Sequence, residues 1–358
     1  AGLSTFHKSA RTRTPEHNFQ HISPIFISHL ENHMIRSIQI LVLSVIIAGC
    51  NSEKIFIPTV RFEEVFFGDA PLNEVYFTSA TTGVIVGDEG QFLQSTDGGR
   101  TWLQVAEAPI DINYNVISFP TTSIGYVSGD GALLKTVDGG VTWNLIFEGY
   151  HFIYTCFPTA TIGYAIDGNY VYKSTDGGET WNDIYAYSSC GIAQARAIYF
   201  YTASSGYLVD ESWSYVATST SGGNSFTYAI ERPSIAYAHT RRAVNGLSYW
   251  AAGNDTYYSG MYYTTDGDPI ERFSTDGFAT ENSSYIYAMH SWDGNEFIAI
   301  GTSTIALSHD SGETWTEVFD QNGFNLRLHD AAVLENGRYV GIYDRVVYLL
   351  TQDCTTCE

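Results

Sequence analysis

From about residue 54 onward, the chain alternates short apolar segments with clusters of Gly, Asp, Ser and Thr. Three segments of one design are Gly83–Gly87 (GVIVG), Gly125–Gly129 (GYVSG) and Gly163–Asp167 (GYAID). Short apolar runs between turn-forming residues predict β-strands. No helical periodicity follows Cys50. The pattern therefore predicts an all-β fold made of many short strands.

One motif repeats through this region. Its clear copies are Ser95–Trp102 (STDGGRTW), Thr136–Trp143 (TVDGGVTW), Ser174–Trp181 (STDGGETW) and Ser308–Trp315 (SHDSGETW). Ser219–Phe226 keeps the glycines but lacks the Asp and the Trp, and an interrupted copy near Thr264–Asp268 competes in register with Ser274–Phe278. Positions 97, 138, 176, 221, 266 and 310 are separated by 41, 38, 45, 45 and 44 residues. Such a period is typical of four-stranded propeller blades, which span about 40–50 residues.

The residue types of the motif suit a turn rather than a catalytic site. An Asp before Gly-Gly can accept hydrogen bonds from the backbone of its own turn, and glycines adopt positive φ without strain. The Trp that follows offers a large apolar surface for packing between blades. We therefore expect these residues to be structural: Asp97, Trp102, Asp138, Trp143, Asp176, Trp181, Asp310 and Trp315.

The repeats predict that residues 50–358 form one seven-bladed β-propeller of four-stranded antiparallel blades. The expected blades are about 73–112, 113–151, 152–195, 196–236, 237–284, 285–325 and 326–350. The last of these is too short for four strands, whereas the apolar segment 54–67 belongs to no blade. We expect this N-terminal segment to supply the missing outer strand and close the ring, which also covers an edge that would promote aggregation.

The residues before the repeats predict export. Residues 34–49 read MIRSIQILVLSVIIAG, with one positive charge followed by an apolar run too short to span a bilayer comfortably. This is typical of a secretory signal. Its exit, IAGC, resembles the lipobox of bacterial lipoproteins, which implies that Cys50 becomes the N-terminus and carries a lipid. An ordinary cleaved signal is the alternative. Residues 1–33 precede the first Met and are expected to be upstream translation or a disordered leader.

Charge excludes one large class of function. The chain has 17 Lys and Arg against 39 Asp and Glu, a net charge of −22. A nucleic-acid binder needs a basic surface, so we expect no nucleic-acid partner. We also expect no cofactor and no metal site, because Asp266–Asp268 and Asp293–Asn295 lack the distal Glu of a calcium loop.

Four cysteines follow Cys50. Cys156 and Cys190 fall in the same predicted blade, and Cys354 and Cys357 lie in the C-terminal tail. An oxidising compartment permits a disulfide within each pair, but sequence spacing alone does not establish one. The pairing therefore stays open.

The repeated pattern S/T-x-D-x-G-x-T-W is the Asp-box, or bacterial neuraminidase repeat. Together with the glycine-flanked strands and the lipoprotein-like signal, it resembles the photosystem II stability/assembly factor family over about residues 54–350. The resemblance implies a non-catalytic, membrane-associated propeller that binds another protein. We therefore expect an exported chain in the bacterial envelope, anchored in the bilayer through Cys50, whose partner is a membrane or envelope protein. A glycan is a further possible ligand.

Sialidases and related glycosidases also carry Asp-boxes and are the alternative. A sialidase needs an arginine cluster, a Tyr nucleophile activated by Glu, and a carboxylic acid. Arg196, Arg241, Arg242 and Arg327 fall at or near the starts of predicted inner strands, so an axial site of Arg, Tyr and Glu is open to test. The Arg-Ile-Pro motif that opens sialidase domains is absent, and we therefore expect no catalytic residues and no enzyme activity.

A propeller presents one set of loops per blade around a single axis, which suits recognition of a partner. We expect the partner on the face formed by the loops that enter the inner strands. Tyr and Arg dominate binding hot spots. The candidate residues on this face are Tyr114, Asn115, Tyr154, Arg196, Arg241, Arg242, Tyr287, His290 and His329.

Overall fold

The computed structural model describes residues 60–105, 112–168, 170–185, 195–210, 215–231, 238–239, 247–253, 259–265, 271–272, 286–291, 295–301, 305–312, 314–318, 327–334 and 337–352. The chain divides into two compact units, Ala1–Phe56 and Ile57–Glu358, and the described residues belong to the second. The predicted signal, Cys50, Cys190, Arg241, Arg242, the turn at 266–268, Asp293 and the C-terminal cysteines lie outside them. Among the described residues no helix is long and apolar enough to cross a membrane.

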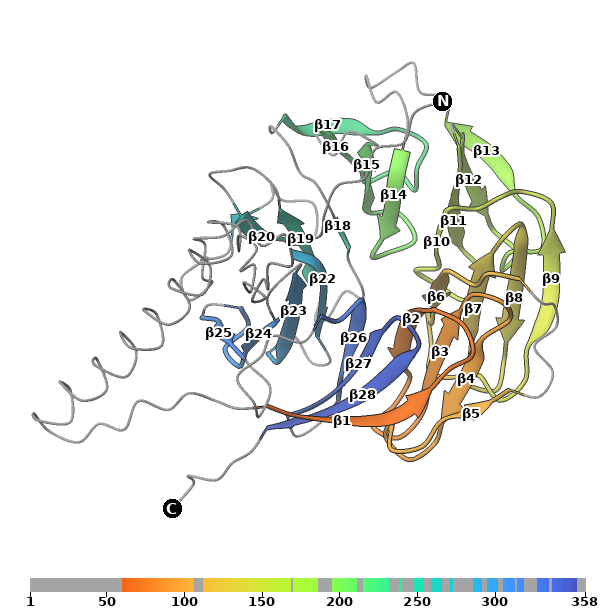
Figure 1. The fold of residues 1–358 in the computed structure, drawn as a ribbon. Helices are drawn as coiled ribbons and strands as arrows, with labels where there is room; N and C mark the ends of the chain where they lie inside the picture. Colours follow the sequence, from red (N-terminus) through yellow and green to blue (C-terminus); the bar gives the residue numbers. More distant parts are fainter. Residues whose placement is uncertain are drawn as a thin grey trace, which may run out of the picture. The chain divides into compact units, whose positions relative to one another are not determined.

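The strands form seven four-stranded antiparallel sheets (Figure 1), numbered here in chain order. Sheet 1 contains β2 (Leu72–Phe77), β3 (Gly83–Gly87), β4 (Phe92–Ser95) and β5 (Leu103–Gln104); sheet 2 contains β6 (Val116–Ser118), β7 (Gly125–Gly129), β8 (Ala132–Thr136) and β9 (Asn144–Glu148). Sheet 3 contains β10 (Tyr154–Cys156), β11 (Gly163–Asp167), β12 (Tyr170–Ser174) and β13 (Asn182–Tyr185); sheet 4 contains β14 (Ala195–Phe200), β15 (Gly206–Asp210), β16 (Tyr215–Ser219) and β17 (Thr227–Glu231).

The other three sheets complete the set. Sheet 5 contains β18 (Ala238–His239), β19 (Leu247–Gly253), β20 (Ser259–Thr265) and β21 (Glu271–Arg272). Sheet 6 contains β22 (Ile286–Ser291), β23 (Phe297–Gly301), β24 (Ile305–Ser308) and β25 (Thr316–Glu317). Sheet 7 contains β26 (Asp330–Leu334), β27 (Arg338–Tyr343), β28 (Val346–Gln352) and β1 (Val60–Phe67).

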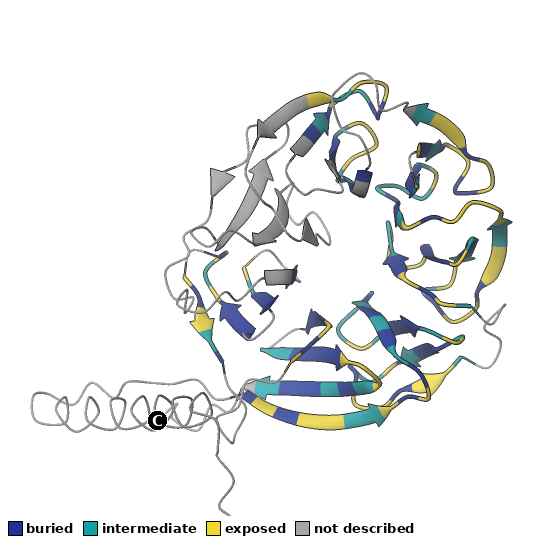
Figure 2. Ribbon diagram, turned by 45° about the horizontal axis from the view of Figure 1, so that its top comes forward, coloured by how far each residue is buried: buried dark blue, intermediate teal, exposed yellow. Residues whose placement is uncertain are grey.

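Within the second unit the sheets follow one another around a central axis (Figure 2). The inner strands adjoin in the order β26, β2, β6, β10 and β14, and β18 adjoins β22, which adjoins β26. This is the predicted all-β propeller with four-stranded antiparallel blades. The strand starts lie close to the expected ones; β26 begins at Asp330 rather than at residue 326, and β6 at Val116 rather than at residue 113.

The first and last described strands pair with each other. β1 runs antiparallel to β28 from Val60 opposite Gln352 to Phe67 opposite Val346. Val60 and Phe62 are buried, whereas Arg61 and Glu63 between them are exposed, as expected for a strand with one packed face. The prediction that an N-terminal strand supplies the outer edge of the last sheet is therefore confirmed.

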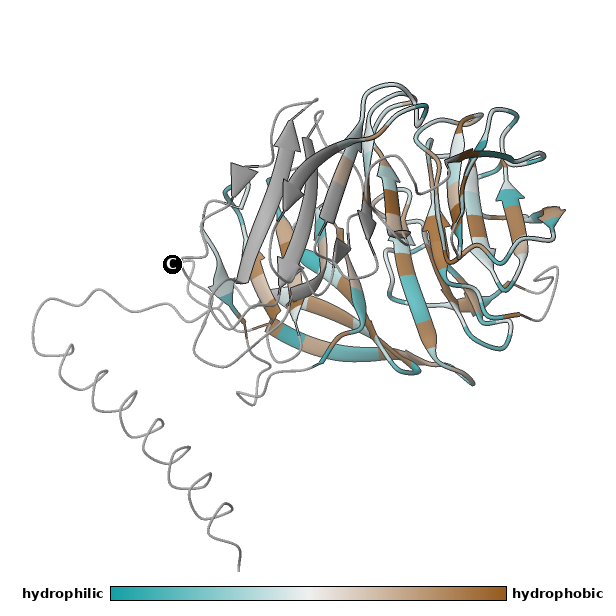
Figure 3. Cartoon of the chain, turned by 90° about the horizontal axis from the view of Figure 1, so that it is seen from above, coloured by the Kyte–Doolittle hydropathy of each residue, from teal (hydrophilic) through white to brown (hydrophobic). Residues whose placement is uncertain are grey.

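The hydrophobic core lies between sheets. Each described core cluster combines residues of two neighbouring sheets, as where Val84 and Phe92 of sheet 1 pack with Ile117 and Trp143 of sheet 2. Figure 3 shows hydrophobic residues gathered on the strands. Because every sheet buries apolar surface on its neighbours, stability depends on contacts around the ring rather than within one sheet.

The Asp-box turns have the expected geometry. In the first copy the Asp97 carboxylate accepts hydrogen bonds from the backbone N–H and the hydroxyl of Thr101, at 2.9 and 2.7 Å, and from the Ser95 hydroxyl at 2.9 Å. The same bonds recur around Asp138, Asp176 and Asp310. In the degraded copy the Ser221 hydroxyl replaces the carboxylate and accepts the Ser225 N–H at 2.9 Å.

Each box also packs against the preceding sheet. Gly99 has φ of +80°, and a Cβ there would lie 2.5 Å from Cγ2 of Val340 on β27, so both conformation and space require glycine. The four box tryptophans, Trp102, Trp143, Trp181 and Trp315, are buried, as the motif predicts. Trp143 contacts Phe92 of sheet 1 and Phe119 of sheet 2, with ring centroids 5.0 and 5.9 Å apart.

Tyrosines on the second strands link neighbouring sheets. The Tyr126 ring stacks on Phe157 at 3.5 Å, and its hydroxyl donates to the Ala160 carbonyl at 2.7 Å. Tyr164 repeats both contacts one sheet later, with Phe200 and the Ala203 carbonyl. The amino groups of Lys135 and Lys173 lie over the Tyr126 and Tyr164 rings, 5.5 and 5.4 Å from their centroids.

Candidate functional site

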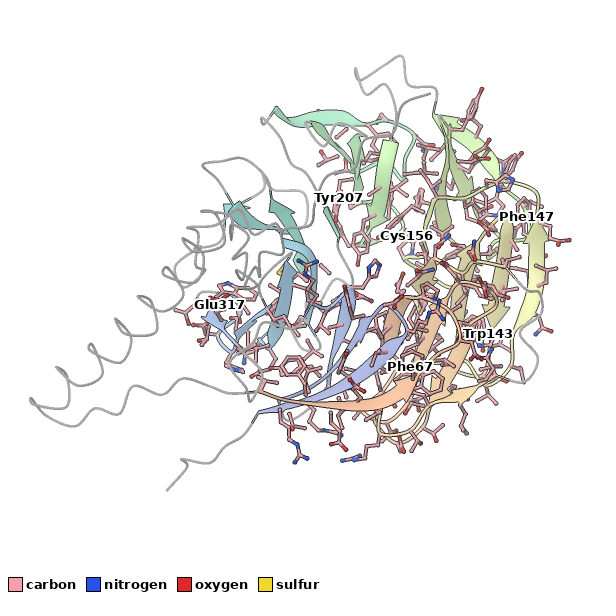
Figure 4. All side chains as sticks on the ribbon, viewed as in Figure 1. Phe67, Trp143, Phe147, Cys156, Tyr207 and Glu317 are labelled. Atoms are coloured by element: carbon pink, nitrogen blue, oxygen red, sulfur yellow. The ribbon has the colours of Figure 1, made fainter. Side chains whose placement is uncertain are left out.

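A cavity of about 390 Å³ lies among the inner strands β2, β6, β10 and β14. Glu74, Tyr76 and Thr78 line it from sheet 1; because successive side chains of a strand point to opposite sides, alternate residues share this face. From sheets 2 and 3 the lining consists of consecutive residues, 116–122 and 154–158, and residues 199–201 line it from sheet 4. Cys156 belongs to this set and is labelled on the ribbon in Figure 4. The cavity is therefore built by equivalent segments of four consecutive inner strands.

The lining is rich in tyrosine and carries one carboxylate. Tyr76, Tyr154, Tyr199 and Tyr201 are half-buried, and Glu74 is only 3% exposed. Among the described lining residues there is no Lys, Arg or His. The described lining therefore combines phenol rings, hydroxyl groups and one acidic side chain.

Hydrogen bonds between sheets hold the cavity wall. The Phe157 backbone N–H donates to the Ser118 hydroxyl at 3.1 Å, and the Phe200 backbone N–H donates to the Cys156 sulfur at 3.4 Å. Ser118 and Cys156 occupy the same position in successive inner strands, as do Phe157 and Phe200. One contact between neighbouring sheets is therefore made twice, with a hydroxyl in one case and a thiol in the other.

The Cys156 thiol is buried and free. The disulfide with Cys190 that the sequence left open is therefore not formed. Burial raises the pKa of the thiol to about 12, although its hydrogen bond with the Phe200 backbone acts in the opposite direction. A thiol with this pKa is protonated at neutral pH, which makes Cys156 a packing group rather than a nucleophile.

A second polar cluster joins three inner strands where the ring closes. The Asp330 carboxylate on β26 accepts the Val75 backbone N–H of β2 at 2.9 Å through Oδ2. Its Oδ1 lies 2.7 Å from His290 Nε2 on β22. All three residues are buried. His290 was expected on a partner-binding face; instead the residue is 7% exposed and its ring is bonded to Asp330, so it links sheets rather than facing a partner.

Tyr114 also departs from its expected role. Its side chain is fully buried, with its ring 5.4 Å from Phe92 in an edge-to-face contact. It cannot contact a partner, because its ring packs in the core between sheets 1 and 2. A large aromatic residue beside a strand fits a core position as well as an interface, and sequence alone does not distinguish the two.

The other described candidates lie on the inner strands or in the segments just before them. Asn115 is exposed and its side-chain oxygen accepts the Asn73 amide at 3.4 Å. His329 is exposed just before β26, as is Arg327. Among the candidates whose side chains the structure describes, Tyr154 lines the cavity.

Arg196 lies on β14 and Tyr287 on β22, each at a break in strand register of the β-bulge type. β2 has the same irregularity at Asn73, whose amide donates to Asp88 at 2.7 Å and to the Tyr114 carbonyl at 3.0 Å. Bulges redirect a side chain and are common next to functional sites. The sequence gives no signal for them, because they depend on the pairing of the neighbouring strand.

The cavity extends to the face opposite the loops that enter the inner strands. Thr78, Pro158 and Tyr201 follow their inner strands, and Pro120–Thr122 follow β6. Thr121 and Thr122 are exposed. The lining thus reaches solvent where the inner strands end. The site residues predicted from the sequence were expected at the other end, where these strands begin.

The described residues contain no group of three or more His, Cys, Asp or Glu that could hold a metal ion. Glu74 is the one carboxylate among the described cavity-lining residues, whereas glycoside hydrolysis by the usual route uses a pair of carboxylates.

Residues 68–329 match the family model described as photosynthesis system II assembly factor YCF48. The chain belongs to this family. No curated protein matches the chain. Among solved structures it is similar to "YCF48 bound to D1 peptide", with 16% identity, a TM-score of 0.61, and coverage of 83% of this chain and 99% of that one.

Two further structures show how widely the fold is shared. YCF48 from Cyanidioschyzon merolae is 15% identical with a TM-score of 0.60, covering 81% of this chain and 98% of that chain. The GH74 xyloglucanase from Xanthomonas campestris is 12% identical with a TM-score of 0.61, and the match covers 81% of this chain but 53% of the enzyme. At these identities the structural matches establish the propeller fold, and the YCF48 family assignment rests on the sequence match.

Proposed function

We propose that this chain is an exported, lipid-anchored, non-catalytic propeller that binds a membrane or envelope protein during its assembly. The observation that carries the proposal is the match to the YCF48 assembly-factor family over residues 68–329. A YCF48 structure that is similar in fold contains a bound D1 peptide, which supports a protein ligand for this fold. The seven sheets serve as the seven blades of one ring, a rigid frame for such a ligand.

The export part of the proposal rests on the sequence of residues 34–50. Cys50 is the mature N-terminus, carries the lipid, and holds the propeller at a membrane of the bacterial envelope. Intact-mass analysis of membrane-extracted protein tests this. The wild type should show the mass of the lipid, and Cys50→Ala should lack it and leave the membrane fraction. An unmodified, soluble wild type would contradict the anchor.

The binding part is tested by crosslinking and pull-down from native membranes, run beside a panel of sialoside and polysaccharide substrates. The proposal expects capture of one membrane or envelope protein and no hydrolysis. Arg327 is exposed before β26, and Arg327→Ala is the first surface variant to assay for loss of capture. Hydrolysis that disappears with Arg327→Ala or Arg241→Ala would favour a glycosidase instead. The substrate panel is included because the fold is similar to that of GH74 enzymes.

A further inference from the structure

The Asp-box repeat allows equivalent surface positions to be compared from sheet to sheet. In the four boxes that contain Trp, the residue after the Trp begins the outer strand and is exposed. This residue is Asn144 in sheet 2, Asn182 in sheet 3 and Thr316 in sheet 6, but Leu103 in sheet 1. The Leu103 residue is 72% exposed. An apolar side chain therefore occupies a solvent-exposed position that is polar in the other three boxes.

A second apolar exception adjoins the first. The residue two positions before the Trp is Arg100 in sheet 1 and Glu179 in sheet 3, whereas it is Val141 in sheet 2. Val141 is 59% exposed. Val141 and Leu103 line one pocket of about 250 Å³, which is formed by sheet 1 and the box of sheet 2. Exposed apolar residues that gather in this way, rather than lying singly, are typical of interaction sites.

Gln94 on β4 lines the same pocket and brings an unpaired hydrogen-bond donor to it. The equivalent residues on the third strands of sheets 2 and 3 are Lys135 and Lys173. The Lys173 amino group donates to the Gly222 carbonyl of the next box at 2.8 Å. The shorter Gln94 makes no such bond, and its Nε2 is buried without a hydrogen-bond partner among the described residues. Turning the terminal amide toward the pocket therefore breaks no bond of Nε2, and an acceptor placed there would relieve the cost of a buried, unbonded donor.

The lining determines the chemistry of the occupant. None of the described lining residues is charged, so a charged group would lose hydration there without gaining an opposite charge. The Thr101 hydroxyl is already bonded to Asp97, and the Gln104 amide to the Gly90 carbonyl. Gln94 is the buried donor that is left.

The size of the pocket and this donor favour a peptide. A volume of about 250 Å³ lies just below the range of about 300–1,000 Å³ that is usual for organic ligands, which suits one large apolar side chain. A lipid acyl chain has no acceptor for the Gln94 amide, whereas a peptide supplies both an apolar side chain and backbone carbonyl groups.

We propose that this pocket, formed by Gln94, Leu103 and Val141, binds an uncharged peptide segment of a protein partner. An aliphatic side chain of the segment packs against Leu103 and Val141, and the Gln94 amide donates to a carbonyl of its backbone. This inference rests on the proposed protein-binding function. It adds a contact on the outer strands of the ring and the chemistry of the segment that is recognised.

Ligand-observed NMR with the purified full chain tests the proposal, since it detects weak binding. The probe is the capped peptide acetyl-Gly-Ser-Leu-Ser-Gly-amide, compared with the same peptide carrying Ser, Lys or Asp in place of Leu. The Leu peptide should bind at least about fivefold more tightly than each of the others, because its side chain gains most from burial. A Ser, Lys or Asp peptide that binds as tightly as the Leu peptide would overturn the proposal.

Matched variants locate the site. Val141→Thr should weaken binding of the Leu peptide at least about threefold. Val137→Thr makes the same change at an exposed residue of the same box that does not line the pocket, and it should leave binding unchanged. Leu103→Asn and Gln94→Lys introduce the residues that sheets 2 and 3 carry at these positions, so both variants should fold and both should weaken binding. Circular dichroism checks the folding, and equal weakening by the two Val variants would reject the pocket.

The same variants identify two other occupants. If the Leu peptide does not bind, but phosphatidylcholine vesicles bind the wild type and not Leu103→Asn, the pocket is a membrane contact and the proposal is overturned. Dimerisation in sedimentation velocity that disappears with Leu103→Asn, again without peptide binding, would make a second copy of the chain the occupant and would also overturn it.

Membrane pull-down with Val141→Thr separates this proposal from the proposed function. Undiminished capture by Val141→Thr, with no binding of the Leu peptide to wild type, would reject the pocket and leave the assembly role standing. Binding of the Leu peptide at the pocket without any captured protein would do the reverse.

Discussion

Asp330 offers the sharpest test of how the ring is held together. Its carboxylate bridges β26 to the Val75 N–H of β2 and to His290 of β22, and so connects sheets 6, 7 and 1 at the point where the chain closes on itself. Asp330→Ala removes both bonds while leaving every strand pairing in place. The expected result is a clear loss of stability without a change of fold.

The magnitude follows from the burial of the donors. Val75 is 0% and His290 7% exposed, so water does not readily replace the lost carboxylate. A buried donor that loses its acceptor costs about 1–3 kcal/mol. With at least these two donors affected, we expect the free energy of unfolding to fall by about 3–5 kcal/mol.

Urea denaturation followed by circular dichroism and tryptophan fluorescence provides the assay. Asp69→Ala is the control, since Asp69 is exposed and lies close in sequence to β2. Asp330→Asn keeps one acceptor oxygen and should lose less than Asp330→Ala. A loss below about 1 kcal/mol for Asp330→Ala would refute the reasoning, because surface substitutions alone produce changes of that size.

Three further predictions concern stability. Trp143→Ala should lower the free energy of unfolding by about 3–5 kcal/mol in urea, since its ring is buried between two sheets; a loss below about 1 kcal/mol would contradict this. Deleting residues 1–67 should lower the melting temperature well below that of a chain lacking residues 1–50, because only the longer deletion unpairs β28; equal melting would contradict closure by β1. Hydrogen bonds from the Thr180 hydroxyl and backbone lower the pKa of Asp176 from 3.8 to about 2, so its stabilising effect is complete above the unfolded value and is lost as pH falls through about 2. The stability difference between wild type and Asp176→Asn should therefore shrink from about pH 5 to pH 2 in acid titrations, and a constant difference would show that the carboxylate charge is not involved.

The repetitive part of the fold was predictable from the sequence because its information is local. Each Asp-box specifies its own turn, as the hydrogen bonds around Asp97 show, and its Trp needs only a neighbouring sheet to be buried. The spacing of the boxes then sets the amount of chain in each sheet. Even the partner of β1 could be inferred, because one strand was missing from the last sheet and one apolar segment was left over.

The site could be predicted much less well, since it depends on contacts between sheets. Tyr114 and Tyr154 look alike in sequence, yet one is fully buried and the other lines the cavity. Tyr114 lies two residues before β6 and packs in the core between sheets 1 and 2, whereas Tyr154 is the first residue of β10, and the sequence does not mark where each strand begins. Glu74 was not predicted as a cavity residue, because a single acidic residue in an apolar strand forms no recognisable motif. Its position in the cavity depends on how the sheets are arranged around the axis.

The pairing of β1 with β28 also has a consequence for the order in which the protein is made. β1 precedes every other described strand in the chain, and β28 follows all of them, so their contact joins the two most distant strands in the sequence. Pairing over such a separation is slow compared with local contacts, whereas each internal sheet can form from consecutive strands. Among the described strands, β1 is therefore synthesised first and its partner β28 last. Until β28 arrives, β1 exposes Val60, Phe62 and an unpaired edge, so a factor that binds extended apolar segments would have its greatest effect on this protein at β1.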